Sequence, residues 1–212
     1  MRRATIVTLC LAVAASGCSG AGRVRSANSS AATTTTTSPP TTSSSAPAPP
    51  PRQPVVLLHG TFGMTSWGVI EGALSAAGYA VYPFDYGNAG TDEIGRSAGT
   101  LAGFVDDVLL RSGAKRVSII GHSQGGLVAR YYVKYLGGSE HVDDLIGLSP
   151  SNHGTTNPLV VQTGLIGCAA CAEQQADSPF LANLNAGDET PPPVDYTVIQ
   201  TRRDEVVIPY TS

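Results

Sequence analysis

The feature that most constrains the fold is an alternation between short apolar runs and amphipathic helix patterns, which begins at Val55. Apolar runs typical of strands cover residues 55–58, 79–84, 115–120, 142–148 and 194–200, and helical spacing of apolar residues covers 67–77, 92–112 and 125–136. Alternating strands and helices form a mostly parallel sheet with helices on both faces. We therefore expect one α/β domain over residues 55–212. Its irregular excursion at 151–193 should hold one short helix, near 177–186.

Charge is spread unevenly along the 212 residues. Residues 1–54 contain five Arg and no acid, whereas residues 55–212 contain eight basic and 16 acidic side chains. An acidic domain repels phosphate backbones, so we expect no nucleic-acid partner. The composition, 42% hydrophobic and 14% charged, is sufficient for a packed core. It says nothing about the oligomeric state.

The first 18 residues have the pattern of an export signal. Two arginines precede an apolar run at residues 4–15, which is too short to cross a membrane and typical of a signal peptide. The run ends in Ala15-Ser16-Gly17-Cys18, which resembles a bacterial lipobox, so Cys18 is a candidate for lipidation and membrane anchoring. Ordinary cleavage near Cys18 and free secretion remain the alternative. Either way, we expect an exported protein.

Residues 19–54 are dominated by Ser, Thr and Pro in their second half. Such a segment cannot bury enough apolar surface to fold, so it is predicted to be a disordered linker. It would hold the domain at 55–212 away from a membrane.

The motif Gly121-His122-Ser123-Gln124-Gly125 stands directly between a predicted strand and a predicted helix. It matches G-x-S-x-G, in which the serine sits on a strained turn and the flanking glycines let the backbone bend. Ser123 is therefore the candidate nucleophile, lying where the helix N-terminus favours a developing oxyanion.

A second motif, His59-Gly60-Thr61, ends the first predicted strand. In an α/β-hydrolase, one oxyanion donor is the N–H after the nucleophile, here Gln124, and the other comes from the loop after this strand. We assign the second donor to Thr61. His59 is interpreted as a brace for this loop.

Residues 54–212 resemble the actinobacterial branch of the class 2 lipases, which are small α/β-hydrolases. The resemblance is carried by the segments PVVLLHGTFG, SWGVI…GYAVYPFDYG, GHSQGGLVARYYVKYLGG, VDDLIGLSPSNHGTT and VDYTVIQTRRDEVVIPYTS. It implies hydrolysis of carboxylic esters, above all of lipids, without a metal or organic cofactor. It also implies that Asp204 is the catalytic acid, which orients a histidine.

The sequence departs from this family at the histidine, which should follow the acid in chain order. All four histidines precede Asp204. We therefore expect that the catalytic histidine, the last strand and the closing helix are missing from this chain. His122 should point away from Ser123, and His141 should lie at the far end of the sheet. His153, after the strand at 142–148, is the one possible substitute base.

Cys168 and Cys171 form a C-x-x-C without the context of a redox or zinc motif. In an exported protein they are predicted to form disulfides, with each other or with cysteines in a missing C-terminal segment.

Two functions remain open from the sequence. The first is a serine lipase or esterase. The alternative is a non-catalytic surface lipoprotein that binds lipid through the same cleft.

Overall fold

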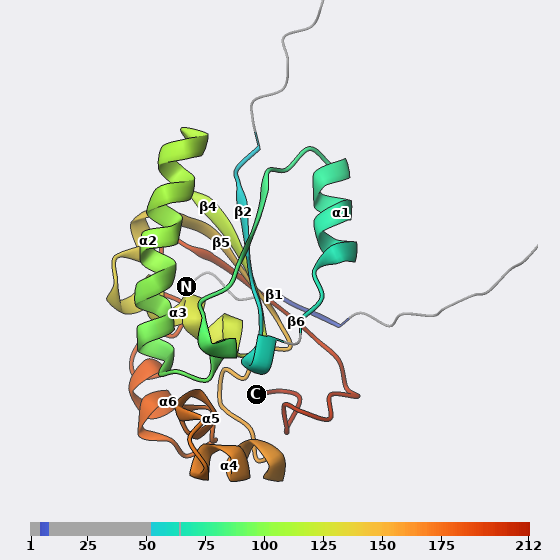
Figure 1. Cartoon of the computed structure of the whole chain (residues 1–212), viewed down its shortest axis with the longest axis vertical. Helices are drawn as coiled ribbons and strands as arrows, with labels where there is room; N and C mark the ends of the chain where they lie inside the picture. Colours follow the sequence, from blue (N-terminus) through green and yellow to red (C-terminus); the bar gives the residue numbers. More distant parts are fainter. Residues whose placement is uncertain (1–4, 9–51, 64) are drawn as a thin grey trace, which may run out of the picture. The chain divides into compact units, whose positions relative to one another are not determined.

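The computed structural model describes residues 5–8, 52–63 and 65–212 (Figure 1). The predicted lipidation site Cys18 and nearly all of the predicted export signal and linker lie outside these residues. None of the described helices has the length and apolar character needed to cross a membrane.

The described strands form one parallel sheet in the order β1-β6-β5-β4-β2-β3. Five of them confirm the predicted strands to within two residues at each end. The bounds are β1 Thr5–Thr8, β2 Val55–Leu58, β3 Val81–Phe84, β4 Val117–His122, β5 Val142–Leu148 and β6 Asp195–Gln200. The predicted α/β-hydrolase-like fold with helices on both sheet faces is therefore confirmed.

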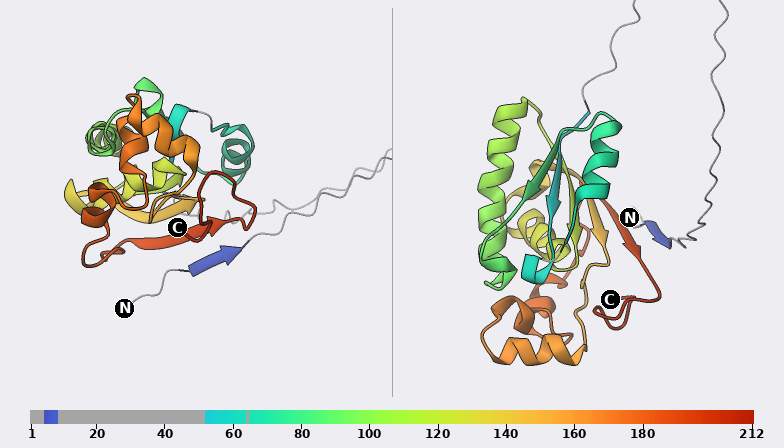
Figure 2. Two further views of the ribbon diagram at one scale, coloured as in Figure 1. Left: turned by 90° about the horizontal axis from the view of Figure 1, so that it is seen from below. Right: turned by 45° about the vertical axis from the view of Figure 1, so that its right-hand side comes forward.

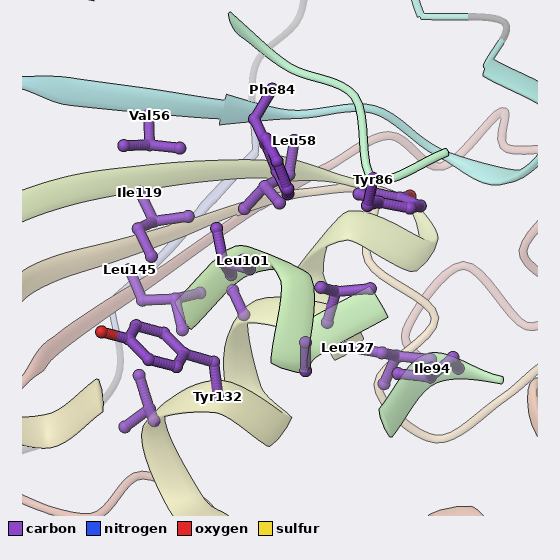
Figure 3. Packing of buried hydrophobic residues seen from close by; sticks show 14 of the residues in the cluster. Val56, Leu58, Phe84, Tyr86, Ile94, Leu101, Ile119, Leu127, Tyr132 and Leu145 are labelled. Atoms are coloured by element: carbon purple, nitrogen blue, oxygen red, sulfur yellow. The ribbon is translucent and has the colours of Figure 1, made fainter. Parts of the chain in front are cut away.

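One face of the sheet is covered by α2 (Ile94–Ser112) and α3 (Gln124–Tyr135). The apolar stripe of α2 is fully buried, as its spacing predicts, and packs with α3 against inward residues of β2 and β4 (Figure 3). The labelled core comprises Val56, Leu58, Phe84, Tyr86, Ile94, Leu101, Ile119, Leu127, Tyr132 and Leu145. Burial of this apolar surface is the main favourable contribution to folding.

The other face carries α1 (Gly68–Ala76), which lies across the sheet from α2 and α3 (Figure 1). Trp67 packs with Val55 and Leu57 of β2 in a second, smaller cluster. Every residue of β2 is buried because its side chains alternate between the two clusters.

The excursion between β5 and β6 contains three short helices where we predicted one. They are α4 (Pro158–Leu165), α5 (Ala169–Glu173) and α6 (Pro179–Leu184), of which α6 matches the expected helix. Helix α4 could not be predicted because its residues are mostly apolar and show little contrast between the faces of the helix. Local caps define it instead: Asn157 accepts from the Leu159 N–H, and Pro158 occupies the first helical position.

The described residues also contain three short 3₁₀ turns, which are η1 (Thr61–Gly63), η2 (Asn88–Gly90) and η3 (Gly138–Glu140). The carboxyl ends of the strands meet at one edge of the sheet because all strands are parallel. The excursion and the C-terminal segment lie at this end (Figure 2). In parallel α/β sheets this is the edge where ligands bind.

Candidate active site

Ser123 occupies the sharp turn between β4 and α3, as predicted. Its backbone has φ 53° and ψ −121°, a region that non-glycine residues rarely adopt. Strain of this kind costs about 1–3 kcal/mol and persists only where surrounding structure enforces it. The turn places Ser123 in the wall of a cavity at the carboxyl edge of the sheet.

The glycines on either side of Ser123 permit this turn because no side chain would fit there. A Cβ at position 121 would lie 2.5 Å from the carbonyl carbon of Gly125, and a Cβ at position 125 would lie 2.6 Å from the carbonyl oxygen of Leu58. Both distances are far below van der Waals contact. The G-x-S-x-G spacing is thus explained by close backbone packing of β2, β4 and α3.

The cavity beside Ser123 has a volume of about 370 Å³. It is formed by the loops that follow β2, β4, β5 and β6 and by parts of α4 and α5. Its lining residues are Gly60, Thr61, Phe62, Thr65, His122, Ser123, Ser149, Ser151, Thr155, Leu159, Val160, Thr163, Cys171, Gln174, Thr201, Arg203, Asp204, Glu205, Val206 and Val207. The structure therefore brings Ser123, Thr61 and Asp204 to one cavity from three distant parts of the chain.

The loop after β2 lies directly beside the serine turn. Leu58 pairs with Gly121 in the sheet, and a Cβ at position 60 would lie 3.1 Å from the Cβ of Ser123. Thr61 lines the cavity, whereas Gln124 is fully buried and is not among the lining residues. Both residues begin helical turns, whose first N–H groups have no acceptor within the helix. Their role as oxyanion donors stays a prediction.

His59 contacts the loop that it was predicted to brace. It is buried, with Nδ1 2.7 Å from the carbonyl oxygen of Gly60 and Nε2 3.2 Å from Oδ1 of Asp85. Its ring stacks on Tyr86 at 4.1 Å between centroids, and the Tyr86 hydroxyl donates to the His59 carbonyl. Asp85 has a lowered pKa, first because the Gly87 N–H donates to its carboxylate and second because of His59.

Asp204 follows β6 in a tight turn. Its Oδ1 accepts hydrogen bonds from the N–H groups of Val206 and Val207, at 3.0 and 2.9 Å. These two donors hold the carboxylate in place. A fixed carboxylate in the cavity wall is suited to orienting an imidazole.

We expected His122 to point away from Ser123, but His122 also lines the cavity. Its ring bonds to the loop after β2, with Nδ1 2.8 Å from Oγ1 of Thr65. Burial lowers the pKa of His122, and the charge of Asp204 opposes part of this shift. The neutral imidazole is therefore favoured beside the nucleophile.

The substitute base considered from the sequence, His153, is not brought to the cavity. Its Nε2 lies 3.2 Å from Oε2 of Glu189, and its side chain is 56% exposed. His141 lies immediately before β5, at the opposite edge of the sheet from Ser123, as expected. Its Nδ1 is 3.7 Å from Oδ1 of Asp106.

Cys168 and Cys171 form a disulfide with each other, which resolves the pairing that the sequence left open. Cys171 lies in the cavity wall. Within the described ranges, no group of three or more His, Cys, Asp or Glu side chains could hold a metal ion.

Sequence reasoning missed three polar residues around the site: Thr65, Ser151 and Gln174. The Gly60 N–H donates to Oγ1 of Thr65 at 3.0 Å, and Nε2 of Gln174 donates to Oγ1 of Thr61 at 3.0 Å. No motif marks these residues. Gln174 in particular is 113 positions from its partner and belongs to the excursion, for which the sequence predicts only one short helix.

Comparison with known proteins gives a consistent result. The family model described as "Lipase (class 2)" matches residues 52–212. A triacylglycerol lipase of Pseudomonas fragi is 33% identical over 151 residues, which are 66% of this chain and 50% of that protein. A triacylglycerol lipase of Pseudarthrobacter phenanthrenivorans is 36% identical over 88 residues, which are 38% of this chain and 28% of that protein. The chain thus spans about a quarter to a half of these curated relatives.

Solved structures show the same fold. Lipase B of Aspergillus fumigatus superposes with a TM-score of 0.66 and 24% identity, covering 76% of this chain and 40% of that one. The mature lipase BlEst2 of Bacillus licheniformis superposes with a TM-score of 0.61 and 17% identity, covering 72% of this chain and 66% of that one.

Proposed function

Because this chain belongs to the class 2 lipase family, we propose that it carries the site of a serine carboxylic-ester hydrolase that acts on lipid esters. The observation that carries the proposal is Ser123, which is held in a strained strand-to-helix turn at a cavity that Thr61 and Asp204 also line. Strained backbone at a cavity wall is typical of a nucleophile presented to substrate.

In this proposal, Oγ of Ser123 attacks the ester carbonyl carbon as a base removes its proton. The N–H groups of Thr61 and Gln124 stabilise the negative charge on the carbonyl oxygen. The alcohol leaves with a proton, and water then hydrolyses the acyl-enzyme to release the fatty acid.

In the complete site, Asp204 would orient the imidazole of a histidine that acts as the base. No histidine follows Asp204 in this sequence, and His153 pairs with Glu189 instead. The proposal therefore includes slow turnover by this polypeptide, because a serine without a base is a weak nucleophile. Loss of a triad member leaves only the catalysis due to the oxyanion donors and substrate binding.

The lipid substrate is supported by apolar side chains near the cavity. Leu159 of α4 lines the cavity and is 67% exposed, and Leu165 and Ile166 at the end of α4 are 79% and 83% exposed. No charged residue occurs between Gly154 and Ala172. Exposed apolar groups beside a site are typical of surfaces that bind apolar partners.

We further propose that the protein is exported, with Cys18 as its lipid anchor. A Cys18→Ala variant of the full chain, expressed in a bacterium that processes lipoproteins, should lose its association with membranes. Retention of the variant in the membrane fraction would contradict the anchor.

The function is tested by hydrolysis of p-nitrophenyl butyrate and p-nitrophenyl palmitate by the full chain. Ser123→Ala is the control, and circular dichroism checks that both proteins are folded. Turnover above that of Ser123→Ala supports the proposal. Equal rates for the two folded proteins, also with imidazole added, would contradict ester hydrolysis and leave lipid binding without catalysis.

A further inference from the structure

A chain of hydrogen bonds links the loop at Thr61 to the excursion between β5 and β6. The Ser151 hydroxyl donates to Oε1 of Gln174 at 2.9 Å, and Nε2 of Gln174 donates to Oγ1 of Thr61 at 3.0 Å. The Thr61 hydroxyl in turn donates to Oε1 of Gln124 at 2.6 Å. Gln174 is 4% exposed and Ser151 is 1% exposed, so water competes little for these bonds.

The direction of the bond between Gln174 and Thr61 follows from their other partners. Thr61 has one hydroxyl proton, which Gln124 Oε1 accepts, so Thr61 Oγ1 must act as acceptor toward Gln174. The amide nitrogen of Gln174 also donates to the Ala170 carbonyl at 3.1 Å. Reversing the Gln174 amide would place its oxygen against the Ala170 carbonyl. The bonding pattern therefore defines a single amide orientation.

Gln174 is itself held by rigid parts of the domain. The Thr155 N–H donates to the Gln174 carbonyl at 2.9 Å. The preceding residue, Glu173, accepts from the Ile94 N–H at 2.6 Å at the start of α2. The Cys168–Cys171 disulfide closes the other end of α5. The backbone of Gln174 is thus held in place, and its side-chain amide can position Thr61 through their hydrogen bond.

The loop at Thr61 requires such a support. Phe62, the next residue, has φ 63° although it is not glycine, and the residue is 42% exposed. A left-handed backbone at an aromatic residue is unfavourable and must be maintained by contacts elsewhere. The side chain of Phe62 contributes little to this because much of it faces solvent.

We propose that Gln174 is a positioning residue for the oxyanion donors, acting through the Thr61 hydroxyl. It holds Thr61 against Gln124, so that the backbone N–H groups of both residues address the same carbonyl oxygen. This inference rests on the proposed ester hydrolysis. Gln174 takes no part in bond making or breaking.

The test compares Gln174→Met, which keeps the side-chain length and removes the amide, with the matched variant Gln175→Met. The side chain of Gln175 lies beside Gly164 of α4. Amide hydrogen exchange of the full chain is followed for a peptide spanning residues 58–66, and needs no turnover. We expect about tenfold faster exchange in this peptide for Gln174→Met, unchanged exchange in β4, and wild-type behaviour for Gln175→Met.

Kinetics then tests the catalytic consequence. Oxyanion donors act on the transition state, so Gln174→Met should lower the Ser123-dependent kcat about tenfold while KM stays within about twofold. Thr61→Val should show the same defect, Thr61→Ser should restore activity, and adding Thr61→Val to Gln174→Met should cause little further loss.

The two proposals can fail separately. Unchanged exchange at residues 58–66, or faster exchange with an unchanged kcat, would overturn the role of Gln174. Absence of any Ser123-dependent reaction in the wild type would overturn the proposed ester hydrolysis, and the exchange measurement would still decide whether Gln174 holds the loop.

Discussion

The hydroxyl of Thr61 donates a 2.6 Å hydrogen bond to Oε1 of Gln124, so the side chains of the two proposed oxyanion donors bond to each other. One residue follows β2 and the other begins α3, 63 positions later. The bond connects the loop and the serine turn as one unit. Donors held in this way need little reorganisation when charge develops on the substrate, which is the basis of electrostatic catalysis.

Imidazole in solution should act as the base for Ser123. If Asp204 and the oxyanion donors are in place, added imidazole should raise Ser123-dependent hydrolysis of p-nitrophenyl butyrate roughly tenfold or more. The measurement is the initial rate against imidazole concentration, minus the rate of Ser123→Ala, which corrects for hydrolysis by imidazole itself. Asp204→Asn should weaken the effect. Equal responses of the wild type and Ser123→Ala would contradict this assignment.

Gly121→Ala should destabilise the domain by about 3 kcal/mol or more, or prevent folding, because the new Cβ would lie 2.5 Å from the backbone of Gly125. The matched control is Gly99→Ala on the exposed side of α2, where nothing lies within 4 Å of the added Cβ. That control should stabilise by roughly 0.5–1 kcal/mol. Urea unfolding followed by circular dichroism measures both. Similar midpoints for the two variants would refute the packing argument.

His122 should make the domain less stable in acid. Its folded-state pKa is lowered by burial, so the folded protein binds a proton at lower pH than the unfolded chain, whose reference value is 6.5. The stability that depends on a neutral His122 is fully present above pH 6.5, and it is lost as the pH falls through the lower, folded-state pKa. His122→Gln should therefore lose less stability than wild type between pH 7 and 5 in urea unfolding.

The charge of Asp204 should affect the pKa of His122, which burial lowers. Because the charge of Asp204 raises the pKa of His122, Asp204→Asn should lower that pKa further. Proton NMR titration of the His122 ring measures this directly. A shift to higher pH in Asp204→Asn would show that the two side chains do not interact as the structure indicates.

Glu173 should stabilise α2 as a cap rather than as a charge. Its Oε2 accepts from the Ile94 N–H, while burial raises its pKa from 4.5. Because the pKa of Glu173 is raised, the stability that its protonated carboxyl contributes is fully present below pH 4.5. It declines as the pH rises through the folded-state pKa. Glu173→Gln keeps the acceptor without the buried charge, so it should match or exceed wild-type stability at pH 7. Glu173→Ala should lose about 1 kcal/mol. Equal loss in both variants would assign the stabilisation to the charge.

The exposed apolar residues at the end of α4 should affect the rate of hydrolysis of aggregated substrates only. Leu165→Ser combined with Ile166→Ser should reduce hydrolysis of emulsified long-chain esters roughly tenfold and leave soluble p-nitrophenyl butyrate unaffected, because both side chains are exposed. Val69→Ser, at a site on α1 that is 87% exposed, is the control. Parallel loss on both substrates would indicate a folding defect, and no loss on either would exclude α4 from lipid contact.

Parts of the site could be predicted because the pattern reports local backbone requirements. The glycines at 121 and 125 bracket a serine between strand and helix patterns, and that spacing is required by close backbone packing. His59 and Thr61 could be placed because they follow a strand that pairs with β4. The helices α4 and α5 could not, since short caps at Asn157 and Cys168 define them without a periodic pattern.

By itself, the sequence determined the order of the strands β2 to β6 and of the helices α1 to α3, the serine turn and the family, because each of these follows from local periodicity or from residues close together in the chain. The tertiary structure alone decided what surrounds the serine. It brought Gln174 to Thr61 across 113 residues, placed His122 in the cavity wall and directed His153 to Glu189. Such contacts depend on how β5, β6 and the excursion between them pack at one edge of the sheet, and no local pattern encodes that packing.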